Sequence, residues 1–116
     1  MRPDQHASLT PERWSAFSLD QQILMIGNEM HRASKLFAAE DRERLLGSYE
    51  RVLRLTELTT LTHSKPTLRR ELMLWRGVIA GLYASPAPSP TTHRQALSVL
   101  LQFTPTAYAQ TPYLGL

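Results

Sequence analysis

Apolar residues recur along this chain at alternating intervals of four and three residues. The spacing runs through three segments, from Leu19 to Phe37, from Leu45 to Thr56 and from Leu68 to Leu82. At about 100° per residue, each segment gathers its apolar side chains on one narrow stripe of an α-helix. Three such stripes in one short chain have to bury each other. The pattern therefore predicts an all-α fold with an antiparallel three-helix bundle as its core.

Capping residues set the expected limits of these helices. Ser18 and Gln21 form a capping box that starts the first long helix, which we expect over residues 18–39. Glu40 and Asp41 favour the start of a second helix near residue 40, where negative charge is stabilising. Pro66 makes it unlikely that this helix continues through the turn after residue 61. The second and third helices are accordingly expected over 40–61 and 67–84, joined by short turns that make neighbours antiparallel.

The chain divides into four expected parts. Residues 1–9 read as a flexible polar leader, and residues 10–84 as the helical bundle domain, which opens with a short helical turn. Residues 85–91 contain alternating prolines and form a semi-rigid spacer. Residues 92–116 should form a short fourth helix, opened by a capping box at Thr92, and an apolar tail without a regular period. Because of its composition, we expect this tail to dock on the bundle or on a neighbouring subunit.

Two glycines in the third helix, Gly77 and Gly81, form a G-x-x-x-G pattern on the face opposite the apolar stripe. Each glycine costs a helix about 1 kcal/mol relative to alanine, so we expect the close approach of another helix to compensate. That helix is either the C-terminal helix of the same chain, covering the glycines with Leu97, Leu100 and Leu101, or a helix of a second subunit.

The second helix has apolar residues outside its main stripe, Leu55 and Leu58, which suggests that it is covered on several sides. The C-terminal segment adds two tyrosines that favour burial or contact. The full set of interface candidates is Leu55, Leu58, Leu74, Gly77, Gly81, Leu97, Leu100, Leu101, Tyr108 and Tyr113.

Composition excludes several classes of protein. The 116 residues include no cysteine, which rules out a disulfide scaffold and a thiolate zinc site, and 42% are hydrophobic. No apolar run approaches the roughly 20 residues that span a bilayer, and the start of the chain lacks the apolar stretch of a signal peptide. We expect a cytoplasmic protein with no membrane association.

The net charge of +3 does not come from a dense basic patch. Basic and acidic residues nearly balance up to Glu71, and beyond it the only charged residues are Arg76 and Arg94. Nucleic-acid binding through Arg69, Arg70 and Arg76 on the third helix is the alternative function, because this helix follows a turn as a recognition helix does. Clustering of basic residues on one face, which such binding needs, is weak.

Two carboxylates lie at the edge of the expected core, Glu29 on the first helix and Glu71 on the third. A buried carboxylate needs a partner, and the candidate partners are Arg32, Arg51 and Arg76. We interpret this group as a set of structural ion pairs. A carboxylate metal site or an acid–base site is the alternative interpretation.

Motifs for metal binding and catalysis are absent from the sequence. No acidic residue has a histidine three residues later, as di-metal helical bundles require, and the histidines at 6, 31, 63 and 93 do not form a ligand set. There is no G-x-S-x-G motif and no phosphate-binding glycine loop. We expect no metal and no cofactor, and an enzyme with a dispersed polar site ranks third among the functions considered.

The function expected from the sequence is a small non-catalytic helical module for protein–protein interaction that associates with itself. Its partner is a protein, in the first instance a second copy, and it presents an apolar helix face or its C-terminal tail.

Overall fold

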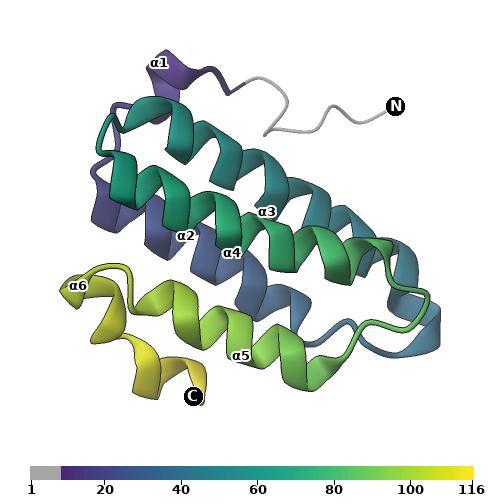
Figure 1. Cartoon of the computed structure of the whole chain (residues 1–116). Helices are drawn as coiled ribbons and strands as arrows, with labels where there is room; N and C mark the ends of the chain where they lie inside the picture. Colours follow the sequence, from purple (N-terminus) through teal and green to yellow (C-terminus); the bar gives the residue numbers. More distant parts are fainter. Residues whose placement is uncertain (1–8) are drawn as a thin grey trace.

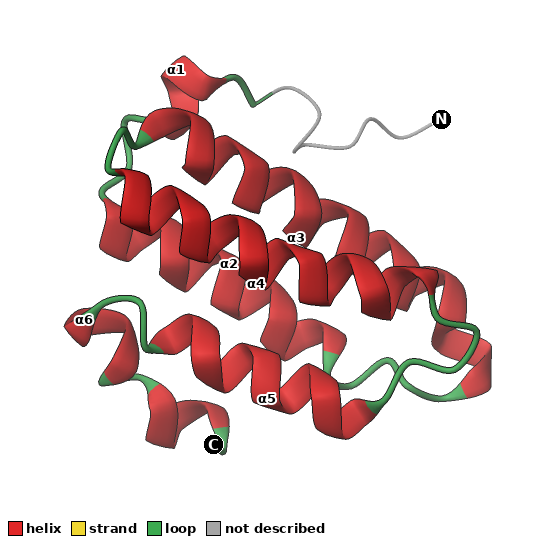
Figure 2. Ribbon diagram, in the orientation of Figure 1, coloured by secondary structure: helices red, strands yellow, loops and turns green. Residues whose placement is uncertain are grey.

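The three apolar stripes form long helices in a computed structural model that describes residues 9–116. Residues 1–8, most of the expected leader, lie outside the described part. The elements in chain order are α1 (Pro11–Trp14), α2 (Leu19–Ala33), η1 (Ala39–Asp41), α3 (Arg42–Thr62), α4 (Pro66–Ala84), α5 (Pro90–Leu101), α6 (Pro105–Tyr108) and η2 (Thr111–Leu114). Figure 2 shows helices and loops throughout these residues and no strand. The all-α fold expected from the sequence is confirmed.

Helices α2, α3 and α4 form the antiparallel bundle, and α5 completes it on one side (Figure 1). Helix α3 packs against both α2 and α4, while α5 packs against the same two helices from the other side. The four helices thus make a closed arrangement in which each has two neighbours. This position gives α5 a larger share of the core than a helix appended to a finished three-helix bundle would have.

Short helix α1 is attached to the bundle by buried polar contacts. Trp14 is fully buried, and its indole Nε1 donates a hydrogen bond to the Thr59 hydroxyl of α3 at 2.9 Å. The Gln22 side-chain amide donates to the Trp14 carbonyl oxygen at 2.9 Å. These bonds satisfy polar groups that would otherwise be costly to bury, so the indole can enter the core.

Helix α2 ends at Ala33, six residues before the expected limit near Ala39. The N–H groups of Lys35 and Leu36 donate hydrogen bonds to the carbonyl oxygens three residues before them. This is the spacing of a 3₁₀ turn, which is tighter than an α-helix and ends it here. The apolar spacing nevertheless continues to Phe37, because its ring reaches the core from the loop. Its centroid lies 5.3 Å from that of the buried His93 ring.

Helix α5 begins two residues earlier than expected, at Pro90. The cap is Ser89, whose hydroxyl accepts a hydrogen bond from the N–H of Thr92 at 3.1 Å, rather than Thr92 itself. Proline at the first helical position needs no hydrogen-bond donor, which explains why the last proline of the spacer belongs to the helix. The segment after α5, expected to be a tail without a regular period, contains α6 and η2, and η2 is followed by Gly115 at φ 73°.

Candidate functional site

An open apolar groove of about 470 Å³ lies between α4 and α5. Leu74 and Val78 of α4 form one wall, and Val99 of α5 forms the other together with Phe103, two residues after the end of α5. Trp75 and Ala96 lie at its floor, where they are only 4% and 5% exposed. Large apolar side chains from two helices thus lie together at the surface here.

A hydrogen bond fixes the floor of the groove. The indole Nε1 of Trp75 donates to the backbone carbonyl oxygen of Ala96 at 2.8 Å. This bond ties α4 to α5 and satisfies the polar atom of a buried aromatic ring. The two walls are therefore held at a defined separation by a core residue.

Several apolar side chains on and beside the walls are open to solvent. Leu74 is 68% exposed, Val78 45% and Val99 49%, and Met73, the residue before Leu74, is 51% exposed. A single exposed leucine needs no explanation, but a contiguous apolar patch on a small protein marks a site of interaction.

Gly77 and Gly81 lie on the same exposed side of α4 as Leu74 and Val78. A methyl group built on either glycine would meet no atom within 4 Å. The expectation that Leu97, Leu100 and Leu101 cover these glycines is wrong, because those leucines pack into the core against α2. We call Leu74, Gly77, Val78 and Gly81 the outer face of α4.

The leucines of α5 pack instead on Gly27 of α2. A β-carbon at Gly27 would lie 3.3 Å from Leu101 Cδ2 and 3.8 Å from Leu97 Cδ1, with Leu100 also in contact. The close approach of two helices over a glycine does occur in this chain, but it uses a glycine that the G-x-x-x-G pattern did not identify. Leu97, Leu100 and Leu101 are at most 2% exposed and do not belong to an external interface.

Leu55 and Leu58 are likewise buried within the chain, at 1% and 0% exposure, which corrects their selection as interface candidates. Helix α3 packs against α1, α2 and α4, so its several apolar sides are covered without a partner. Helix α3 therefore carries apolar residues on several sides because it has neighbouring helices on several sides.

The C-terminal tail docks on its own chain. Helix α6 packs against α2 and α5, Ala107 is fully buried, and the Arg94 guanidinium donates to the Gly115 carbonyl oxygen at 2.6 Å. Tyr108 and Tyr113 remain 59% and 81% exposed, and neither lines the groove.

The polar rim of the groove consists of Glu71, Thr92 and Gln95. Glu71 was expected to be partly buried and paired with an arginine. It is exposed instead, and within residues 9–116 it takes part in no ion pair. The reason is its place on α4, one turn before Trp75 but turned toward the open groove rather than toward α3.

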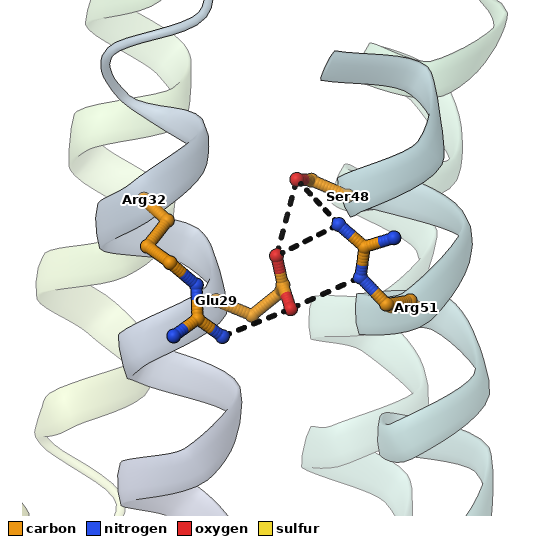
Figure 3. A network of polar contacts seen from close by, with 4 residues as sticks. All are labelled: Glu29, Arg32, Ser48 and Arg51. Atoms are coloured by element: carbon orange, nitrogen blue, oxygen red, sulfur yellow. Dashed lines mark hydrogen bonds and ion pairs between the residues drawn. The ribbon is translucent and has the colours of Figure 1, made fainter. Parts of the chain in front are cut away.

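Glu29 is the centre of a buried polar network that joins α2 to α3 (Figure 3). Its carboxylate accepts hydrogen bonds from Arg51 Nε and Nη2 at 3.1 and 3.2 Å, from Arg32 Nη2 at 3.1 Å and from the Ser48 hydroxyl at 3.1 Å. The Glu29 side chain is 4% exposed. The structure thus brings together three of the five residues expected to form core ion pairs.

The electrostatics of this network favour an ionised carboxylate. Burial alone would raise the pKa of Glu29, but the hydrogen bonds and positive charges of Arg51 and Arg32 outweigh it and hold this pKa below its ordinary value of 4.5. Both carboxylate oxygens are occupied by donors. The arrangement is suited to linking two helices rather than to moving a proton or holding a cation.

The arginines considered for nucleic-acid binding do not gather on one surface. Arg76 donates to the Leu53 carbonyl oxygen at 3.1 Å and lies 3.9 Å from the Glu57 carboxylate, so it faces α3. Arg69 and Arg70 are exposed but point to different sides of α4, since consecutive helical residues are about 100° apart.

Two histidines take structural roles that the sequence analysis did not assign. His93 is 1% exposed, with Nε2 lying 2.8 Å from the Met30 carbonyl oxygen and Nδ1 2.8 Å from the Tyr49 hydroxyl. His63 Nε2 lies 2.7 Å from the Gln22 side-chain oxygen. The helical spacing of His93 from Ala96 and Leu97, by three and four residues, indicates a core position and was the available clue.

Within residues 9–116, no three His, Asp or Glu side chains are grouped closely enough to hold a metal ion. None of the helices described there has the length and apolar character needed to cross a membrane. In comparisons with protein-family models, curated proteins and solved structures, nothing matched this chain, so its function is argued from the geometry above.

Proposed function

We propose that this protein is a small non-catalytic interaction module that binds an apolar helical surface of a protein partner along the α4–α5 groove and the outer face of α4. The observation that carries the proposal is the exposure of Leu74, Val78 and Val99 on two helices whose relative position a core tryptophan fixes. Self-association is the form of binding that the sequence favours.

The charge distribution supports a partner that is itself apolar. From Leu72 to Ala84 the only charged residue is Arg76, and it is turned toward α3. A surface without charge at its centre gives little electrostatic steering and gains its affinity from burial of apolar area. Glu71 at the exposed rim can supply one polar contact.

Residue-specific photo-cross-linking tests this proposal. A photoreactive amino acid is placed at Leu74 or Val99, inside the proposed site, and at Leu61 as the control. Leu61 is comparably exposed, at 55%, but it lies at the end of α3 and does not line the groove. We expect protein adducts in the source cell from positions 74 and 99 and none above background from position 61. Equal labelling at all three positions, or none at 74 and 99, would overturn the proposal.

A further inference from the structure

The exposed residues on the outer face of α4 alternate in size. Leu74, Gly77, Val78 and Gly81 follow the spacing of three, one and three residues that places them on one side of a helix. Along the helix the order is large, small, large, small. The glycines leave open notches, since a β-carbon on either would meet nothing within 4 Å, and Leu74 projects beside them with 68% of its surface exposed.

The two ends of this face are complementary when one copy is reversed. A twofold axis perpendicular to the two helices, level with Gly77 and Val78, places Leu74 of each copy opposite the Gly81 of the other, while Val78 lies beside the second copy's Val78. Leu74 of each copy then fills the notch left by a glycine, and the contact is isologous, as twofold interfaces are. A parallel pairing would instead set Leu74 against Leu74 and leave the glycine notches empty.

We propose, on the basis of the function proposed above, that the partner is a second copy of this chain, bound by antiparallel packing of the outer face of α4 on itself. Glycines allow the two helix backbones to approach closely, which gives a reason for two residues that lower helix stability.

The charges fit this arrangement. The contact centre, from Met73 to Leu82, contains one charged residue, Arg76, and this side chain faces α3 rather than the outer face. Arg70, one turn before Leu74, comes to lie near the C-terminus of the second copy's α4, where a positive charge is favourable. Helix α4 has no basic residue in its own last turn, so the second copy supplies that charge.

The available area suits a reversible dimer. The contact is made by α4, which has 19 residues, so at 1.5 Å per residue and about 10 Å width its exposed face projects to roughly 290 Å² per copy. Standard interfaces bury about 800 Å² per partner. We therefore expect a weak dimer, with a Kd of about 10 to 100 µM.

Sedimentation velocity over a concentration series across that range tests the stoichiometry. The intact chain should change from monomer to dimer. Leu74→Lys should weaken dimerisation by at least about 30-fold, because it sets a charge against an apolar surface. The matched control, Leu61→Lys, should dimerise like the unchanged chain. An unchanged chain that stays monomeric at all concentrations overturns the inference.

A size exchange tests the antiparallel register. Gly81→Leu alone should weaken the dimer, because Leu74 of one copy then meets a leucine of the other. Adding Leu74→Ala to Gly81→Leu restores a large residue opposite a small one at both positions, and dimerisation should recover. If the double variant is as weak as Gly81→Leu, the proposed register is wrong.

Cysteine pairing gives an independent readout, since the chain contains no cysteine. Mixing the single variants Leu74→Cys and Gly81→Cys under oxidising conditions should give covalent dimers faster than either variant alone. Preferential pairing of Leu74→Cys with itself would indicate a parallel arrangement and contradict the inference. Cross-links from positions 74 and 99 to a different protein, with no dimer, would leave the proposed function standing and reject only the second copy as partner.

Discussion

His93 and Tyr49 form a hydrogen bond inside the core, with 2.8 Å between the imidazole Nδ1 and the phenolic oxygen. The other ring nitrogen, Nε2, lies 2.8 Å from the Met30 carbonyl oxygen, which can only accept. Nε2 therefore carries the proton of the neutral ring, and Nδ1 accepts from the Tyr49 hydroxyl. This pair connects α5 to both α2 and α3, so the docking of the fourth helix depends on a neutral histidine.

Stability should consequently fall as the solution becomes acidic. Burial lowers the pKa of His93 below 6.5, and burial also lowers the pKa of His63. The unfolded chain then binds more protons than the folded chain below pH 6.5, so the stabilisation is complete above that pH and is lost as the pH falls toward the folded-state pKa. Each histidine that is protonated in the unfolded chain but neutral in the folded chain changes the free energy of unfolding by up to about 1.4 kcal/mol per pH unit.

Urea unfolding between pH 7.5 and 5 measures this slope, and an NMR titration of the His93 ring in the unchanged chain assigns it. His93→Gln should reduce the slope, and His63→Gln should reduce it separately. A ring pKa for His93 at or above 6.5 would show that the assignment is wrong.

Loss of the Glu29 charge should cost more stability than loss of Arg32, the more exposed of its two arginine partners. Glu29→Gln removes the charge that pairs with Arg51, whose side chain is 32% exposed, and should destabilise the fold by about 2 to 4 kcal/mol. Arg32→Ala removes a partner that is 66% exposed and should cost less than about 1 kcal/mol, because solvent screens its charge. Chemical denaturation compares the two variants, and equal losses would contradict the network as described.

Trp75→Ala should destabilise the protein by about 3 to 5 kcal/mol, since it empties an aromatic core site and removes the bond to Ala96. Trp75→Phe keeps most of the volume and separates the contribution of the hydrogen bond, about 1 kcal/mol. Thermal melts report both effects. A melting temperature for Trp75→Ala within one degree of the unchanged chain would mean that Trp75 does not hold α4 against α5.

The sequence was sufficient for the existence and approximate limits of the main helices, because apolar periodicity and the Ser18 capping box are local properties. It was not sufficient for deciding which glycine receives a neighbouring helix. Gly77 and Gly81 match a known packing pattern, whereas Gly27 stands alone on α2. The choice depends on how α5 is oriented across the bundle, and no local spacing encodes that orientation.

A matched pair of substitutions distinguishes the two kinds of glycine. Gly27→Val places methyl groups against Leu101 and its neighbours in a packed core and should destabilise by about 1 to 3 kcal/mol. Gly77→Val meets nothing within the chain and should be close to neutral, since valine is a slightly better helix former than glycine. Urea unfolding measured below 1 µM, roughly tenfold under the expected dimer Kd, keeps both variants monomeric. A larger loss at Gly77 than at Gly27 would contradict the packing of α5 on α2.

The glycines on the outer face of α4 should show opposite effects on folding and on association. Gly77→Ala and Gly81→Ala should each stabilise the monomer by about 1 kcal/mol, because alanine is the better helix former and its methyl group has open space around it. The same methyl groups enter the contact between two antiparallel α4 helices and should weaken the dimer. Unfolding at low protein concentration and sedimentation at high concentration measure the two quantities for the same variants. If both variants stabilise the monomer and leave dimerisation unchanged, these glycines do not lie in the dimer contact, and the close approach of α4 to itself is excluded.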